Sequence, residues 1–363
     1  MAATTPPPPQ SNSNVYAVVL AGGSGQRFWP LSRERKPKQL LRLFDDRTLL
    51  EHTIARLEGF VPRQNILILT NHQQLGAVRE VLPDFPAENI VAEPEKRDTA
   101  PAIALGIGWV AARNPEAVMM VLPSDHLIRD RAGFHRTLAA ACDAARNSGA
   151  LVTIGIKPSW ACPSYGYIER GRRIDGLQSP VFEVSRFREK PDTELAANFL
   201  GQGNFVWNAG MFFWSVVAVR RDLAAHCPAL AAFVDDLAHA KDFSRTLQAH
   251  FPSLAKLSID YALMEQAPRV LNVEADFDWD DVGNWTSVGQ HLTKDAAGNQ
   301  HNCALSQIEA VGNLVFSETG QHVAMLGVSD LIVIATKDAL LIAHRGEAER
   351  LKKLVDELPE KLR

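Results

Sequence analysis

The sequence predicts an α/β fold with a mixed, mostly parallel sheet, followed by a small C-terminal β-solenoid-like unit and a terminal helix. In the first half, short apolar runs rich in β-branched residues alternate with longer helix-like stretches, as in sheets whose strands are joined by helical crossovers. From about residue 298, short strand-like runs recur at nearly even spacing between Gly, Asp and Asn turns.

The strands of the first half are expected to be buried and parallel, because their apolar residues are continuous rather than alternating. These strands span 16–20, 65–70, 118–122 and 151–156, with another near Ile90, and the helices between them span 49–59, 73–82, 99–114 and 133–149. Beyond Tyr165 we expect a strand at 181–187, a helix at 193–200 and a long Ala-rich helical region at 216–240. This later part is expected to build the pocket of a second substrate.

The C-terminal unit is expected to contain strands at 313–317, 322–326, 331–335 and 340–343, and the charged segment 346–363 is expected to be an amphipathic helix. Residues 1–14 are rich in Pro, Ser and Asn and are expected to form a disordered tail. The predicted organisation is therefore a tail at 1–14, an α/β domain at 15–297 and the C-terminal unit at 298–363.

Composition excludes several classes of function. The formal net charge of −4 gives no basic field for a nucleic-acid polymer, so any anion must be bound by a local cluster. The four cysteines show no C-x-x-C pairing, which argues against a zinc site or a disulfide framework and favours a cytoplasmic location. Without an apolar run long enough to span a bilayer, no membrane partner is expected.

A glycine-rich loop follows the first strand, in the run Leu20-Ala-Gly-Gly-Ser-Gly-Gln-Arg-Phe-Trp-Pro30. Glycines allow backbone N–H groups to approach a phosphate closely. The loop lacks the Gly-Lys-Ser/Thr ending of a P-loop, and Phe28 stands where a dinucleotide fingerprint has its last glycine. An ordinary tight turn is the alternative, but the nearby Arg27 and Lys38 favour a site for phosphates of another kind.

Carboxylates in two segments are candidate metal ligands. Asp125 follows a predicted strand, at the edge where α/β sheets bind ligands, and a second cluster lies at 276–281. Mg²⁺ is commonly held by one or two carboxylates together with substrate phosphates. From the residues alone, Asp125 could equally cap a helix, and the second ligand could be any Asp of the cluster; His126 is expected to be structural.

Several separated motifs together resemble the mannose-1-phosphate guanylyltransferase family. They are the loop Gly22–Ser32 with Lys36-Pro-Lys-Gln39, Pro123-Ser-Asp-His126, Tyr165-Gly-Tyr-Ile168, Phe187-Arg-Glu-Lys-Pro191, Trp207-Asn-Ala-Gly-Met-Phe212 and Trp279-Asp-Asp-Val-Gly-Asn-Trp285. The resemblance implies a Rossmann-like nucleotidyltransferase domain that uses GTP, mannose 1-phosphate and Mg²⁺. It also implies a short bacterial type without the isomerase domain that longer relatives append.

The resemblance implies a role for each motif. It makes Arg27, Lys38 and Lys190 catalytic, and it selects Asp125 and Asp281 as the metal ligands. The loop residues Leu20, Ala21, Gly22, Gly23, Ser24 and Gly25 are implied to bind nucleotide phosphates, and Gly166, Glu189, Lys190 and Asn208 to bind the sugar phosphate. Glu93 and Thr99 are assigned to guanine, whose N–H donors suit a carboxylate.

The expected reaction is in-line attack of the sugar-phosphate oxygen on the α-phosphorus of GTP, with loss of pyrophosphate. Asp98, where the family commonly has Asn, and Pro163-Ser164, where it has Thr-Gly, depart from the pattern near the base and the sugar. Alternatives are a guanylyltransferase for another sugar 1-phosphate, such as a heptose, and a non-catalytic nucleotide-sugar sensor. The oligomeric state is left open, with a homodimer as one option.

Overall fold

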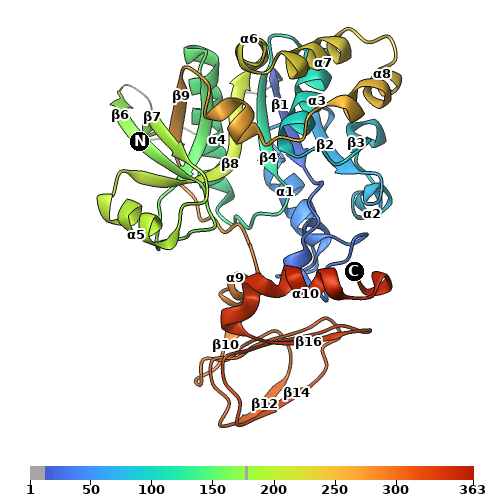
Figure 1. The fold of residues 1–363 in the computed structure, drawn as a ribbon, viewed down its shortest axis with the longest axis vertical. Helices are drawn as coiled ribbons and strands as arrows, with labels where there is room; N and C mark the ends of the chain where they lie inside the picture. Colours follow the sequence, from blue (N-terminus) through green and yellow to red (C-terminus); the bar gives the residue numbers. More distant parts are fainter. Residues whose placement is uncertain (1–12, 176–178) are drawn as a thin grey trace, which may run out of the picture.

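A nine-stranded sheet organises the first three quarters of the chain, in the order β3-β2-β1-β4-β8-β5-β9-β7-β6 (Figure 1). The computed structural model describes residues 13–175 and 179–363. Strands β1 to β4 are parallel to one another, β5 is parallel to β9, and β8 runs antiparallel between β4 and β5. The sheet is therefore mixed and mostly parallel, as predicted. Its strands are β1 (Val15–Leu20), β2 (Ile66–Asn71), β3 (Ile90–Glu93), β4 (Val118–Pro123), β5 (Leu151–Ile156), β6 (Tyr167–Ile174), β7 (Val181–Arg188), β8 (Phe205–Ser215) and β9 (Val270–Glu274).

Helices cover both faces of this sheet, which explains why its central strands are apolar throughout. One core includes α1 and α4, and the other includes α3, α6, α7 and α8. The helices are α1 (Leu49–Leu57), α2 (Leu75–Val81), α3 (Thr99–Ala111), α4 (Arg131–Ser148), α5 (Thr193–Gln202), α6 (Val216–His226), α7 (Pro228–Ala238), α8 (Phe243–His250) and α9 (Trp285–Gly289).

The helical region predicted over 216–240 consists of two helices. The chain leaves helical geometry at Cys227 and begins α7 with Pro228 at its first position. Proline disfavours helical geometry in the residue before it and suits the first turn of a new helix, so the break follows from the sequence itself.

The C-terminal part is a small β-helix-like unit below the large sheet (Figure 1). Its parallel pairs, β11 with β13, β13 with β15 and β12 with β14, stack successive coils. The buried Asn313 amide donates to Asn299 Oδ1 at 2.9 Å, which joins two coils at a corner. The strands are β10 (Thr293–Lys294), β11 (Gln300–His301), β12 (Leu305–Ile308), β13 (Leu314–Ser317), β14 (Val323–Leu326), β15 (Leu331–Ala335) and β16 (Leu340–His344).

The terminal segment is not the single helix predicted over 346–363. A 3-10 turn (Arg345–Arg350) leads into α10 (Leu351–Glu357), and Pro359 separates α10 from a last 3-10 turn (Glu360–Leu362). In Figure 1, α10 lies between the α/β part and the β unit.

An aromatic cluster joins the two parts just below the glycine loop. The Trp285 ring lies 5.5 Å from Phe28 and 5.2 Å from Phe316, measured between ring centroids. Trp29 Nε1 also donates to the carbonyl of Leu362 at 2.8 Å. The C-terminal unit therefore packs directly on the segment that follows the loop.

The predicted boundaries at 14 and 297 stay predictions. Residues 1–12 of the predicted tail lie outside the described residues, whereas the carbonyl of Asn14 accepts a hydrogen bond from Val118 N at 3.0 Å. β10 pairs with β11, so the five-stranded sheet of the β unit begins at Thr293. Within the described residues, no helix is long and apolar enough to cross a bilayer.

Candidate active site

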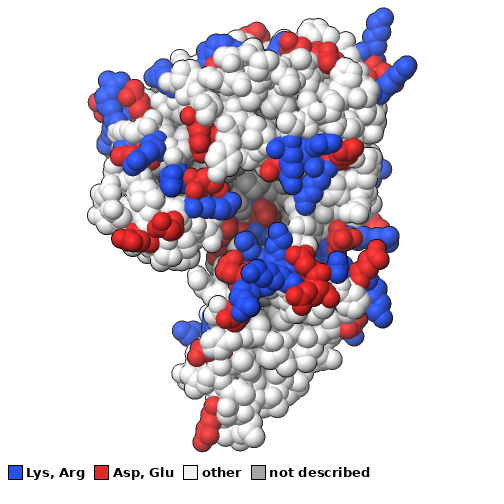
Figure 2. Space-filling view, in the orientation of Figure 1, with Lys and Arg blue, Asp and Glu red and all other residues white. Residues whose placement is uncertain are grey.

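A cavity of about 480 Å³ opens at the carboxyl ends of β1 and β4, where loops of parallel strands converge. Figure 2 shows a hollow near the middle of this face, with Lys and Arg side chains along its rim and acidic side chains among them. The lining includes most of the candidate residues: Leu20, Gly22, Gly23, Glu93, Thr99, Asp125, Gly166, Glu189, Lys190, Asn208 and Asp281.

The glycine loop is held by its carbonyl oxygens. Amide groups of Gln39, Asn71 and Gln74 donate to the carbonyls of Ala21, Gly22 and Gly23 over distances of 2.7 to 3.4 Å. Within the described residues, by contrast, no acceptor contacts the N–H groups of residues 22–25. Successive unpaired N–H groups form a concave surface suited to an anion, which is what a phosphate requires.

Gly25 fixes how the loop meets Lys38. Its φ is +60°, and a Cβ there would lie 2.5 Å from both the Cβ and the backbone N of Lys38. Glycine tolerates both the left-handed conformation and this close approach. The segment that carries Lys38 therefore packs against the loop.

Lys38 links two carboxylate-bearing segments. Its ammonium donates to Asp125 Oδ2 at 2.9 Å and to the backbone carbonyl of Asp281 at 2.5 Å, and the residue is only 8% exposed. Burial raises the pKa of the Asp125 carboxyl, but the charge of Lys38 and the hydrogen bond from Lys38 outweigh burial and hold that pKa below its usual value. Asp125 is therefore ionised at neutral pH.

Asp281 lies beside this pair in a different environment. Burial raises the pKa of its carboxyl despite the nearby Lys38 charge and a hydrogen bond from the Tyr165 hydroxyl to Oδ1 at 2.5 Å. The neighbouring His126 is neutral, because burial lowers its pKa to about 4, and its Nδ1 accepts from Trp279 Nε1 at 3.1 Å. This histidine thus has a packed, hydrogen-bonded place in the site wall.

The carboxylates fit a metal that is completed by substrate. Over residues 13–175 and 179–363, no group of three or more His, Cys, Asp and Glu could hold a metal ion. Asp125 and Asp281 supply one carboxylate each beside the glycine loop, and Mg²⁺ commonly takes such a pair together with phosphates and waters. The two carboxylates therefore suit a Mg²⁺ ion that is also bound by substrate phosphates, rather than a metal ion held by protein ligands alone.

The opposite wall carries the residues assigned to the sugar phosphate. Asn208 Nδ2 donates to Asp260 Oδ1 at 3.2 Å, and Lys190 Nζ lies 2.9 Å from Glu189 Oε1. A Cβ on Gly166 would lie 2.5 Å from Glu189 Oε2, so the glycine leaves the carboxylate its position. Burial and the nearby Glu189 raise the pKa of Asp260 to about 6.

Glu93 and Thr99 lie on either side of a strained residue. Burial raises the pKa of Glu93 to about 7, although Lys96 opposes the shift. Asp98 has a φ of +68° and caps α3 by accepting from Thr99 N at 2.8 Å. Thr99 Oγ1 in turn accepts from Ile259 N at 2.9 Å, so the threonine ties the start of α3 to the segment before Asp260.

Arg27 does not line this cavity. Its Nε lies 3.3 Å from Glu349 Oε2 in the turn before α10, and both side chains are about half exposed, at 48% and 53%. Its predicted catalytic role stays a prediction.

Comparisons with known proteins agree with this geometry. Residues 16–297 match the family described as nucleotidyl transferase, and residues 306–358 match a mannose-phosphate isomerase/GMP-like β-helix domain. The mannose-1-phosphate guanylyltransferase of Escherichia coli K12 is 38% identical over 357 residues, which cover 96% of this chain and 74% of that protein.

The chain belongs to the mannose-1-phosphate guanylyltransferase family. A second family member, ManC of Salmonella typhimurium, is 38% identical over 95% of this chain and 73% of its own length. A crystal structure from Thermus thermophilus, described as a mannose-1-phosphate geranyltransferase, aligns with a TM-score of 0.84 at 33% identity and covers 94% of this chain and 98% of that one.

In this family member, the predicted site residues fall into three groups. Most line the cavity together, while Lys38 reaches it through Asp125 and Asp281. Ala21 is fully buried under the loop, and Ser24 lines a second cavity. Gly25 supports the loop at its contact with Lys38, and Arg27 points to the C-terminal turn.

Sequence reasoning missed four residues that shape the site. Tyr165 and Gln39 stand inside motifs quoted for their neighbours, so their polar groups were the available signal. Asp260 lies on a π-helical turn (Asp260–Met264), and Gln74 directly precedes α2, with its side-chain amide donating to the Gly23 carbonyl. Neither of these two carries a local pattern that marks it.

Proposed function

We propose that this chain transfers GMP from GTP to α-D-mannose 1-phosphate, giving GDP-mannose and pyrophosphate. The observation that supports it most directly is the Lys38–Asp125–Asp281 cluster beside a loop with unpaired N–H groups. Membership of the guanylyltransferase family supports the choice of both substrates.

The proposed reaction needs no covalent enzyme intermediate. A mannose 1-phosphate oxygen forms a bond to the α-phosphorus, the bond from that phosphorus to the bridging β-phosphate oxygen breaks, and its electron pair leaves with pyrophosphate. The loop N–H groups bind phosphate oxygens, and Lys38 neutralises charge beside the α-phosphate. Arg27 acts on the departing phosphates once it leaves Glu349. Lys190 neutralises the incoming sugar phosphate.

A magnesium ion held by Asp125 and Asp281 would supply Lewis-acid charge stabilisation to the phosphates. Asp125 suits this role because it is ionised, and Lys38 positions the two aspartate segments relative to each other.

We propose that residues on one wall of the cavity select the base and that residues on the opposite wall select the sugar. Glu93, when ionised, accepts hydrogen bonds from the guanine edge, and Thr99 positions the start of α3 beside it. Glu189 and Asn208 bond the sugar hydroxyls, and Gly166 leaves them room. A carboxylate and an amide in fixed positions discriminate hydroxyl arrangements, because an unmatched hydroxyl leaves a buried polar group unpaired.

A pyrophosphate-release assay tests this proposal. It pairs each of the four common ribonucleoside triphosphates with mannose, glucose and heptose 1-phosphates, with and without Mg²⁺. We expect turnover with GTP, mannose 1-phosphate and Mg²⁺ together. Preference for a heptose 1-phosphate would favour the alternative sugar, and nucleotide-sugar binding without turnover would favour a sensor.

Cellular context and assembly are part of the proposal. Both substrates are charged metabolites, so we propose a cytoplasmic enzyme, which cell fractionation tests. A homodimer is the assembly we propose, and light scattering on the purified protein measures it.

A further inference from the structure

A second cavity, of about 400 Å³, lies on the outer side of the glycine loop. Gly22, Glu93 and Lys96 line both cavities, so the two adjoin. Gly23 faces the first cavity, whereas Ser24 and Gln26 face the second. A chain of phosphates that follows the loop would therefore pass from the first cavity into the second.

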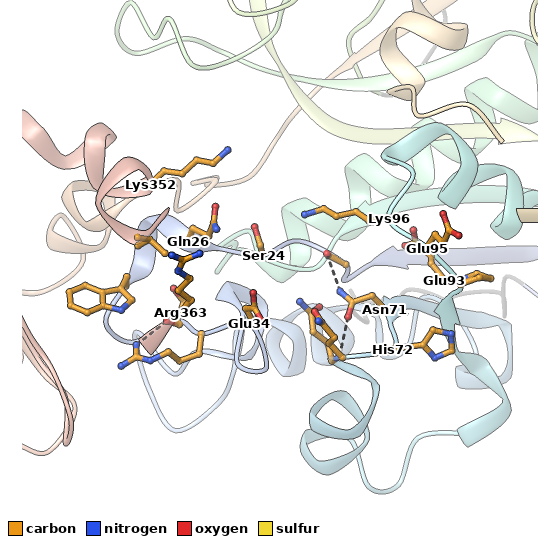
Figure 3. A pocket seen from close by; sticks show the side chains of 18 residues that line it. Ser24, Gln26, Glu34, Asn71, His72, Glu93, Glu95, Lys96, Lys352 and Arg363 are labelled. Atoms are coloured by element: carbon orange, nitrogen blue, oxygen red, sulfur yellow. Dashed lines mark hydrogen bonds between the residues drawn. The ribbon is translucent and has the colours of Figure 1, made fainter. Parts of the chain in front are cut away.

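Two lysines from distant parts of the chain border the second cavity. Lys96 comes from the loop between β3 and α3, and Lys352 comes from α10. In Figure 3 both side chains point toward the space over Ser24 and Gln26. Neither ammonium has a hydrogen bond or ion pair to any described residue. Both positive charges thus remain available to a ligand.

The acidic groups nearby do not neutralise these lysines. Glu95 Oε2 is paired with Arg97 Nη2 at 2.6 Å. Glu34 lies on the other side of the loop from the two ammonium groups in Figure 3. Glu93 forms no ion pair with either lysine within the described residues, and burial raises the pKa of its carboxyl to about 7. The space between the lysines is therefore suited to an anion.

We propose that Lys96 and Lys352, with the Ser24 hydroxyl and the Gln26 amide, bind the β- and γ-phosphates of the nucleoside triphosphate, which leave as pyrophosphate. This inference rests on the proposed function and adds a site that includes the C-terminal unit. The bond that breaks lies between the α-phosphorus and the oxygen bridging to the β-phosphate, and its electron pair stays on pyrophosphate. Two ammonium groups beside pyrophosphate stabilise the negative charge that develops on it as it leaves.

The C-terminal unit has a direct role under this proposal. Lys352 belongs to α10, which packs on the turn after the loop, so the phosphate site is incomplete without the unit. The next residue, Lys353, faces a different cavity between α10 and the β unit. It therefore provides a matched control with the same charge on the same helix.

The test measures binding of three probes by isothermal titration calorimetry in the presence of Mg²⁺: inorganic pyrophosphate, GTP and GMP. We expect Lys352→Ala and Lys96→Ala each to lower the affinity for pyrophosphate and for GTP about tenfold, which corresponds to about 1.4 kcal/mol of binding free energy. The affinity for GMP should change less than about twofold, because GMP lacks the β- and γ-phosphates. Lys353→Ala should leave all three affinities unchanged. Lys352→Arg should retain most of the affinity for pyrophosphate and GTP that Lys352→Ala loses.

Two results would overturn the inference. One is unchanged affinity of both alanine variants for pyrophosphate and GTP; the other is an equal loss for GMP, which would mean that the lysines act through the fold. A failure of the proposed function is distinguishable, because it appears as absent sugar-nucleotide synthesis by the unmodified protein even when the lysines bind pyrophosphate.

Discussion

The Arg27 guanidinium and the Glu349 carboxylate lie 3.3 Å apart, and this contact directs the signature arginine toward the C-terminal turn. Exposed ion pairs contribute only about 0.2–1 kcal/mol to folding stability. A phosphate with two negative charges can therefore compete with Glu349 for Arg27. The contact explains why an arginine assigned to catalysis does not line the cavity.

Replacing each partner of this pair separates the two roles of Arg27. We expect Arg27→Ala to lower kcat by about 100-fold, the usual loss when one charged stabiliser of a transition state is removed. Glu349→Gln should keep kcat within about twofold of the unmodified enzyme. Its free energy of unfolding should change by less than about 1 kcal/mol. Steady-state kinetics and calorimetry measure both; equal losses of kcat would mean that Arg27 serves to dock the C-terminal turn.

Asp125 is expected to control both metal use and turnover. Asp125→Asn should lower kcat by about 100-fold or more and raise the Mg²⁺ concentration needed for half-maximal rate, because one anionic ligand is lost. It should also destabilise the fold by about 1–3 kcal/mol, since the nearly buried Lys38 ammonium loses its charged partner. Asp276→Asn is the control, because Asp276 pairs with Arg136 on the surface. Normal Mg²⁺ dependence in Asp125→Asn would remove Asp125 from the metal site.

The raised pKa of Glu93 leads us to expect that GTP binding depends on pH. This pKa is raised to about 7, so the carboxylate that we propose accepts hydrogen bonds from guanine is present above that pH and is lost by protonation below it. The KM for GTP should therefore rise about tenfold between pH 8 and pH 6, because only about a tenth of the carboxyl is ionised one unit below its pKa. Phosphate groups titrate near pH 6 as well, so the variant Glu93→Gln is essential.

Glu93→Gln should bind GTP weakly at every pH, with a much flatter profile. Glu95→Gln is the matched control, since Glu95 is exposed and paired with Arg97. An unchanged pH profile in Glu93→Gln would assign the dependence to the phosphates alone.

Gly166 is expected to govern the sugar side only. In Gly166→Ala the new Cβ would lie 2.5 Å from Glu189 Oε2 and would displace that carboxylate. The KM for mannose 1-phosphate should rise about tenfold, as expected when a contact of about 1.4 kcal/mol is lost, while the KM for GTP stays constant. Gly201→Ala, in the open surface of α5, is the control and should if anything stabilise the helix. A parallel rise in both KM values would point to a general disturbance of the cavity.

Much of the site could be predicted because its parts are local in sequence. The glycine loop and Asp125 both follow strands, and the ends of parallel strands meet at one edge of the sheet. The break at Cys227 was also predictable, since Pro228 follows it directly in the sequence.

The remaining features depend on contacts between distant segments. Asp260 reaches Asn208 only because the chain between α8 and β9 lines the cavity. Lys352 and Glu349 approach the loop only because an aromatic cluster packs the C-terminal unit beneath it. No local spacing encodes either approach, so a structure was needed to find them.

We propose that this chain joins GMP to mannose 1-phosphate at the cavity at the carboxyl ends of β1 and β4. Quantification of GDP-mannose by chromatography and mass spectrometry, from GTP, mannose 1-phosphate and Mg²⁺, tests it most directly. We expect GDP-mannose and pyrophosphate in equal amounts with the unmodified enzyme and at least about 100-fold slower formation with Asp125→Asn. Absence of GDP-mannose with the folded, unmodified enzyme would rule out this activity.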